Sequence, residues 1–145
     1  MRTRPASQAV RSNWKLARST TPFKGKHDPA AGAQNVKTFI ADSAVLGMIG
    51  PFNSSVAKSE IPLTNDAGLV QISPSNTTDG LMVGDDAKKL RTAHPDTNSY
   101  FRVCTKDSRQ GTALAQFAQK LGYKKVFIID DNETSVARGG PGKLD

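Results

Sequence analysis

The chain has 145 residues, of which 37% are apolar and 23% charged, a composition typical of soluble globular domains and not of fibrous or disordered chains. This length allows one domain with one compact core. No stretch reaches the roughly 20 apolar residues that a membrane-spanning helix needs, and residues 1–19 lack the apolar run of an export leader. We therefore expect a soluble chain, cytoplasmic if it is made as written.

The formal net charge of +7 and the pI near 9.8 come from one end of the chain. Residues 1–27 contain seven Lys or Arg and no acid, whereas residues 28–145 contain 13 basic and 13 acidic residues. Residues 1–26 show neither helical nor strand periodicity, and we interpret them as a disordered basic segment. Such a segment can contact nucleic acid or anionic surfaces, which we keep as an alternative function.

The first predicted elements are a helix and a strand. Asp28 is a good N-cap, Pro29 fits the first helical position, and apolar residues then recur at helical spacing to about Ser43. The uninterrupted apolar run 45–49 then predicts a parallel strand that is covered on both faces.

A second helix and strand follow. After the polar turn 52–55, a helix is expected from about Val56 to Ala67, with Pro62 kinking it or making its second half irregular and Gly68 ending it. Residues 69–72 then predict another buried strand.

The segment 73–104 begins with a second polar turn, rich in hydroxyls, over residues 73–78. Residues 79–99 form a polar connection longer than the usual 4 to 6 residues, which suggests a surface excursion or a functional loop. Residues 100–104 predict a third strand.

The last helix shows the clearest pattern. Asp107 is expected to cap it, with Gln110 completing an approximate capping box. Its apolar stripe consists of Leu114, Phe117, Ala118 and Leu121. Residues 125–129 predict a fourth strand, and the glycines and proline after Thr134 end the ordered part.

Alternating helices and strands predict an α/β fold with a mostly parallel sheet. Ligands bind such sheets beyond the carboxyl ends of the strands, where both polar turns fall. Hydroxyls beside helix N-termini can hold a carboxylate or phosphate, although the same residue types also favour ordinary caps and turns. The candidate anion-binding residues are Asn53, Ser54, Ser55, Ser75, Asn76 and Thr77.

Motifs for catalysis and metal binding are missing from the sequence. His27 and His94 fall in loop segments and suggest no Ser-His-acid arrangement. Cys104 is the only cysteine, so it has no internal disulfide partner and no zinc-site spacing. The acids of residues 130–133 lack calcium-site spacing and favour a solvated turn. We therefore expect no enzyme activity, no cofactor and no metal.

Two units of the sequence are similar to a known family. The segments 28–77 and 100–134, with the motifs IGPFNSS and NDAGLVQISPSNT in order, resemble the leucine/isoleucine/valine-binding proteins of ABC importers. The resemblance covers about 108 of the 145 residues. It implies a periplasmic-binding-protein type I fold, in which two α/β lobes close on an amino acid without chemistry.

The resemblance also implies roles for individual residues. The hydroxyls of Ser54 and Thr77 and the backbone N–H of Ser75 are expected to bind the ligand carboxylate. The implied pocket-lining residues are Phe52, Asn53 and Asn76. The implied partners are a small amino acid or amide and the membrane subunits of an importer, in the periplasm or cell envelope.

The ends of the chain depart from the family pattern. We expect residues 27–105 to belong to a first lobe that lacks its first strand region and 106–134 to start a second lobe that is mostly missing. Residues 1–26 and 135–145 are then non-family segments, as in a truncated or frame-shifted product. On this interpretation the chain is a solute-binding fragment, weakened or inactive as written, whose ligand preference the sequence does not specify.

Overall fold

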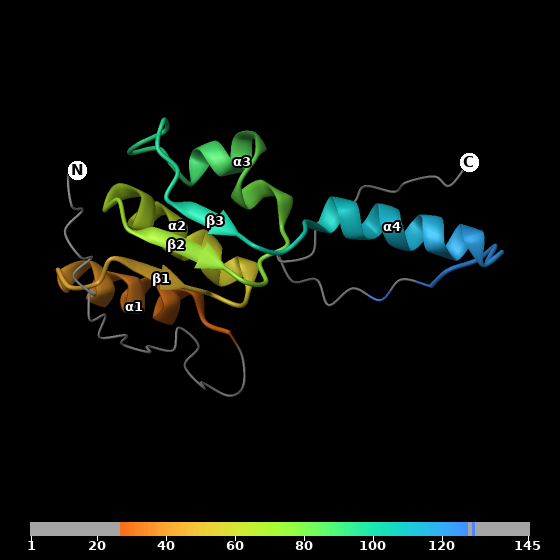
Figure 1. Ribbon diagram of the computed structural model, residues 1–145, viewed down its shortest axis with the longest axis horizontal. Coiled ribbons are helices and arrows are strands. Elements are labelled where there is room, and N and C mark those ends of the chain that lie inside the picture. The colour runs from red at the N-terminus through yellow and green to blue at the C-terminus, as the bar shows by residue number, and fades with distance from the viewer. Residues whose placement is uncertain (1–26, 128, 130–145) are drawn as a thin grey trace, which may run out of the picture.

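The computed structural model describes residues 27–127 and 129, and shows an α/β body from which one long helix projects (Figure 1). The elements in chain order are α1 (Pro29–Ala41), β1 (Gly47–Ile49), α2 (Ser54–Asp66), β2 (Val70–Ser73), the 3-10 helix η1 (Asp79–Leu81), α3 (Gly84–Lys89), β3 (Tyr100–Arg102) and α4 (Asp107–Lys120). The predicted α/β class is confirmed, and the architecture is that of a partial type I periplasmic-binding-protein-like fold.

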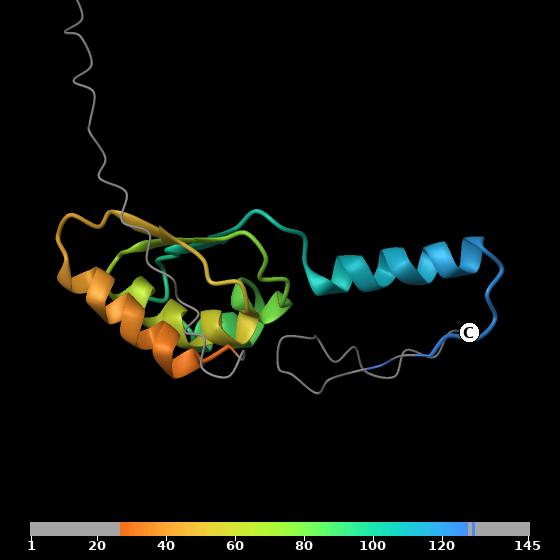
Figure 2. The same cartoon turned by 90° about the horizontal axis from the view of Figure 1, so that it is seen from below.

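The three strands form a parallel sheet in the order β1-β2-β3. In the register, Ile49 is opposite Ile72, and Ile72 is opposite Phe101. Helices α1, α2 and α3 all lie on the same side of this sheet (Figure 2). The carboxyl ends of the strands point toward α4 (Figure 1).

Helix α1 begins as the sequence predicts. The Asp28 carboxylate accepts hydrogen bonds from the backbone N–H groups of Ala30 at 2.8 Å and Ala31 at 3.2 Å, which satisfies donors that the first turn leaves unpaired. Gly32 lets α1 approach α2 closely, because a Cβ there would overlap the side chain of Val56. Gly32→Ala therefore requires the Val56 side chain or the helices to shift.

Two apolar clusters hold the helices against the sheet. The first lies between α1, β1 and the start of β2, and its buried members are Val36, Met48 and Leu69. The second lies between α2, η1 and β3, and its buried members are Ala57, Ile61, Leu81 and Tyr100. Both clusters lie on the helix-covered side of the sheet.

A buried polar network separates these clusters. The Gln71 amide donates to Oε2 of Glu60 at 2.7 Å and accepts from the Thr64 hydroxyl at 2.9 Å. Glu60, Gln71 and Thr64 are all completely buried, and Oε1 of Glu60 has no hydrogen-bond partner among the described residues. Burial raises the pKa of Glu60 to about 7, against the hydrogen bond from Gln71, which lowers it.

The connection 79–99 contains η1 and α3 and is attached to the body through Arg91. This guanidinium donates to the carbonyls of Ala87 and Leu81, both at 2.9 Å, and to the side-chain oxygen of Asn98. Arg91 is only 7% exposed, and desolvation lowers its pKa below the ordinary value. The segment predicted as a long loop is therefore packed against the body and contains one short α-helix.

Two strand predictions are wrong. The run 45–49 does not form a strand covered on both faces, because Leu46 is 83% and Ile49 is 78% exposed, and Val70 and Ile72 of β2 are also partly exposed. Residues 125–127 and 129 form no strand, because a strand needs a hydrogen-bonding neighbour and no described segment pairs with them.

Helix α2 continues through Pro62 to Asp66, so the predicted irregular second half is not observed. The ring is exposed, and Gly68 follows the helix with a φ of 66°, in the left-handed region that glycine adopts without strain. Among the described residues, no helix combines the length and apolar character needed to cross a membrane. The interpretations of residues 1–26 and 130–145 lie outside the described residues.

Candidate functional site

The two polar turns lie side by side at the carboxyl ends of β1 and β2, and Ser73 joins them. Its hydroxyl donates to the carbonyl of Pro51 at 3.0 Å and accepts from the backbone N–H groups of Ser75 at 3.2 Å and Asn76 at 3.0 Å. Ser73 is fully buried. Ser73 was not among the predicted site residues, although its inward position at the end of the strand is a usable signal.

The carbonyl of Phe52 receives two further bonds across the same junction. The Ser75 hydroxyl donates to it at 2.9 Å and the Asn76 side-chain amide at 2.8 Å. Asn76 is fully buried, and its Oδ1 accepts from the hydroxyl of Tyr100 at 3.0 Å. The side chains of Ser75 and Asn76 therefore hold the two turns together, and the lining role expected of Asn76 stays a prediction.

Three other hydroxyls in these turns make no hydrogen bond within the described residues. Ser54, the first residue of α2, is only 3% exposed. The Oγ of Ser55 is shielded from solvent and has no partner among the described residues. Thr77 is half-buried, and only its backbone carbonyl is engaged, by the N–H of Asp107 at 2.9 Å. Ser54, Ser55 and Thr77 thus retain donors for a ligand.

The N-terminus of α2 also favours an anionic ligand. Asn53 occupies the N-cap position, but its side chain makes no capping hydrogen bond. The first backbone N–H groups of a helix lack intrahelical partners and carry partial positive charge, which favours an anion. Phe52, 70% exposed, is positioned at the rim of this edge.

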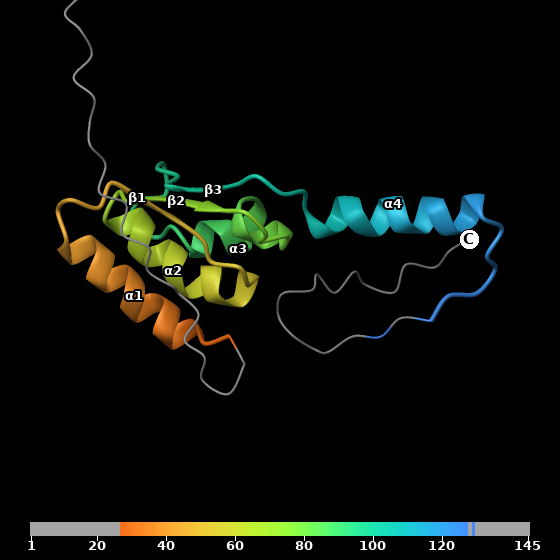
Figure 3. The same cartoon turned by 60° about the horizontal axis from the view of Figure 1, so that its bottom comes forward.

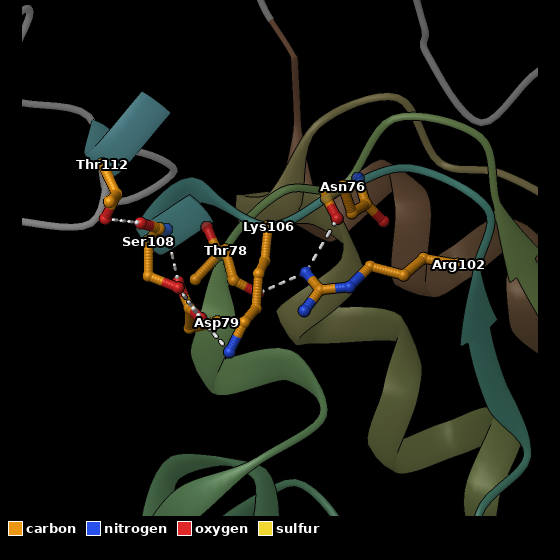
Figure 4. Close-up of polar contacts among 7 residues, drawn as sticks. All are labelled: Asn76, Thr78, Asp79, Arg102, Lys106, Ser108 and Thr112. Atoms are coloured by element: carbon orange, nitrogen blue, oxygen red, sulfur yellow. Dashed lines mark hydrogen bonds and ion pairs between the residues drawn. The ribbon is translucent and has the colours of Figure 1, made fainter. Parts of the chain in front are cut away.

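Arg102 supports the second turn from β3. Its Nη1 donates to the carbonyls of Asn76 at 3.0 Å and Thr78 at 2.8 Å (Figure 4). Arg102 could not be predicted from local sequence patterns, because its contacts span 26 and 24 positions of the chain. The guanidinium fixes the turn and adds positive charge beside it, which favours an anionic ligand.

The start of α4 is held by a carboxylate from another part of the chain. Asp79 accepts from the Ser108 hydroxyl at 2.8 Å and from the Ser108 backbone N–H at 3.1 Å, and its ion pair with Lys106 is 3.1 Å long (Figure 4). Although burial raises the pKa of Asp79, these hydrogen bonds and Lys106 lower it below its ordinary value.

The predicted capping role of Asp107 is wrong. Asp107 is the first residue of α4, Lys106 is at the N-cap, and no N-cap side chain bonds the helix. Asp79 satisfies the free N–H of Ser108 instead. This arrangement was not visible in the sequence, because the two residues are 29 positions apart.

The two turns form an open edge and not an enclosed pocket. Two hollows of about 300 and 250 Å³ lie elsewhere, one between α3 and the loop before β3 and the other between the ends of α1 and α2. Within the described part of the chain, no three His, Cys, Asp or Glu side chains gather as metal ligands do. The edge offers hydrogen-bond donors, and donors beside a helix N-terminus suit an anion.

Comparison with known proteins assigns the chain to a family. The sequence profile of the family described as "Receptor family ligand binding region" matches residues 13–141. The chain belongs to this family. The family is described by its ligand-binding region, and the match covers most of the chain.

One curated relative is the uncharacterized protein MJ1266 of Methanocaldococcus jannaschii, which is 33% identical over 103 residues. The match covers 70% of this chain and 23% of the relative, so the chain spans about a quarter of the length of that relative. No solved structure matches the chain significantly.

Proposed function

We propose that the edge formed by the two turns binds the carboxylate of a small amino acid or a related amide, as the first half of a solute-binding site. The observation that carries this proposal is the group of uncommitted hydroxyls of Ser54, Ser55 and Thr77 beside the uncapped N-terminus of α2. A carboxylate accepts hydrogen bonds only, so it fits a site made of donors.

The resemblance to leucine/isoleucine/valine-binding proteins supports a branched-chain ligand and delivery to the membrane subunits of an importer. The same resemblance supports a periplasmic or cell-envelope location for the complete protein. The chain alone supplies only an open edge, so we expect weak binding. A few hydrogen bonds worth about 0.5 to 3 kcal/mol each must also offset the cost of immobilising the ligand.

The test uses the full chain and three ligands that differ in one group each. Amide resonances of residues 54–56 and 77 are followed by NMR during titration with leucine, 4-methylpentanoate and isoamylamine. We expect leucine and 4-methylpentanoate to shift these resonances at millimolar concentration, because both carry the carboxylate, and isoamylamine to leave them unchanged. Equal shifts with the amine, or none with either carboxylate, contradict the proposal.

Calorimetry with the same chain provides a second measurement. A dissociation constant weaker than about 1 mM corresponds to less than about 4 kcal/mol of binding, which is what an open half-site is expected to give. Micromolar binding of leucine or valine requires a more complete site than the two turns and contradicts this account.

The basic segment supplies the alternative function. Residues 1–26 lie outside the described residues, so a nucleic-acid role for them stays a prediction. It is distinguished by a DNA-binding assay over a range of salt concentrations, because affinity that comes from phosphate contacts falls steeply with salt.

A further inference from the structure

One face of the sheet is apolar and uncovered by any described element. Ile49, Ile72 and Phe101 form one row across the three strands and are 78%, 37% and 45% exposed. Val70 and Val103 extend this surface and are 41% and 78% exposed. The helices of the body all lie on the opposite side (Figures 2 and 3). Parallel sheets in stable folds are covered on both faces, so this open face requires a cover.

Helix α4 carries the matching surface. Its apolar stripe consists of Leu114, Phe117 and Leu121, which are 68%, 59% and 53% exposed, and no residue of the helix is buried. The helix projects away from the body, beyond the carboxyl ends of the strands (Figure 3). An amphipathic helix of this kind gains its stability by packing its stripe against another surface.

The attachment of α4 keeps it away from the sheet of its own chain. The N–H of Asp107 is bonded to the carbonyl of Thr77, and Ser108 is bonded to Asp79. These contacts fix the first turn at the carboxyl edge and direct the helix outward (Figure 1). Folding α4 back onto its own sheet would break them, whereas the sheet of a second copy can be reached with the contacts intact.

Length and charge both fit a second copy. The 14 residues of α4 span about 21 Å, which is enough to cross strands of three or four residues that span about 10 to 13 Å. The C-terminal end of α4 and the residues after it are basic, with Lys120, Lys124 and Lys125. The exposed acids Asp66 and Asp96 lie in the segments that enter β2 and β3, at the amino edge of the sheet.

We propose that two copies of the chain pair by exchanging α4, so that the helix of each copy crosses the open sheet face of the other. Under twofold symmetry, α4 of one copy enters at the carboxyl edge of its partner's sheet. The basic C-terminal end of this helix then lies near the acidic amino edge of the partner's sheet. The exchange covers both apolar surfaces of both copies in one self-complementary interface.

The mass of the full chain in solution, measured by light scattering and by sedimentation, tests the pairing. The chain is expected to be a dimer at tens of micromolar. Phe117→Glu places a charge in the stripe and is expected to weaken the dimer about 30-fold or more, as for the loss of a central apolar anchor. Gln116→Glu adds the same charge to the opposite side of α4 and is expected to leave the dimer intact.

Crosslinking distinguishes exchange from other contacts. Two proteins are prepared in a Cys104→Ser background, one with Leu121→Cys and the other with Val70→Cys, and are mixed under oxidising conditions. Exchange places the end of α4 near the start of β2 of the partner, so a disulfide between the two proteins is expected. A chain that stays monomeric at hundreds of micromolar, because its own α4 or nothing covers the sheet, overturns the proposal. So does a dimer insensitive to Phe117→Glu, or one that crosslinks only through Leu121→Cys pairs.

Discussion

The hydroxyl groups in the two turns have two different roles. The residue type alone does not show which role a hydroxyl has. Ser73 and Ser75 donate to backbone carbonyls across the junction of the turns. Ser54 and Thr77 have no such bond among the described residues, although they occupy equivalent places beside strand ends. Only the second pair is available to a ligand, so substitutions within one motif are expected to differ in effect.

The roles of Ser54 and Thr77 are testable in a chimera that joins residues 27–127 to the remaining parts of a full-length relative. Ser54→Ala and Thr77→Val each remove a hydroxyl that is expected to bond an ionised carboxylate. Bonds of this kind are worth about 1.5 to 3 kcal/mol, which is roughly a ten- to hundredfold loss of affinity by calorimetry.

Ser75→Ala is the matched control in the same chimera. Alanine retains the backbone N–H, which donates to the Ser73 hydroxyl at 3.2 Å, and the Phe52 carbonyl keeps its bond from Asn76 when the Ser75 hydroxyl is removed. The loss of affinity is therefore expected to be small. If Ser75→Ala were the most damaging of the three substitutions, the assignment of residues to the carboxylate would be wrong.

Glu60 is predicted to make stability depend on pH. Its pKa rises from 4.5 to about 7 on folding, so the folded chain binds the proton more tightly than the unfolded chain. The contribution of Glu60 to the free energy of unfolding is then fully present below about pH 4.5 and is lost as the pH rises to about 7, by up to about 3 kcal/mol. Denaturant unfolding at a series of pH values measures this slope.

Glu60→Gln isolates this contribution, because it keeps the shape of the side chain and removes the titration. The slope between about pH 5 and 7 is expected to disappear in the variant. Asp79 does not obscure the result, since its pKa is lowered and its contribution is lost only under more acidic conditions, below the ordinary value of 3.8. An unchanged slope in Glu60→Gln would show that Glu60 is not the titrating group.

At the level of elements, the order and type of the helices and strands up to α4 were predictable, except for η1 and α3, which form within the predicted loop 79–99. Which segments cover the sheet was not predictable. Periodicity and turn residues place α1 and the three strands within a few positions of their observed bounds. An apolar run such as residues 45–49 predicts apolar surroundings. It does not identify the segment that packs against it. The pairing of Glu60 with Gln71 was invisible for the same reason, because tertiary packing brings α2 and β2 together.

Asp79 is predicted to stabilise α4 from outside the helix. Asp79→Asn removes the ion pair with Lys106 and the negative charge at the helix N-terminus, and N-capping contacts of this kind are worth about 0.5 to 2 kcal/mol. We expect faster hydrogen exchange for the amides of α4 and little change in those of β2, because α4 does not pack against the body.

Asp85→Asn is the control for this experiment. Asp85 forms an ion pair of 3.0 Å with Lys88, but both side chains are more than three-quarters exposed, at 85% and 79%. Exposed pairs contribute little to stability. Hydrogen exchange in α4 is therefore expected to match that of the unsubstituted chain, and protection lost equally in both variants would exclude a specific role for Asp79.

Considered as a whole, the described chain has its buried apolar clusters on one side of a three-stranded sheet and large apolar side chains exposed on the other. Domains are stable by only about 5 to 15 kcal/mol, so a second face without a cover removes much of the margin. The outer edge of β1, which pairs with no described strand, adds backbone groups that need partners. We therefore expect isolated copies to be only marginally stable.

The last prediction follows from the small net stability and the uncovered sheet face. At low micromolar concentration the full chain is expected to unfold over a broad temperature range and to bind an apolar dye such as ANS, as loosely packed states do. Raising the concentration is expected to raise the midpoint and sharpen the transition, because association stabilises the folded form by mass action. Thermal melts followed by circular dichroism at several protein concentrations measure this effect. The Phe117→Glu variant is expected to lose the dependence on concentration. A sharp melt from a monomer that is independent of concentration would contradict both the marginal stability and its origin in the open sheet face.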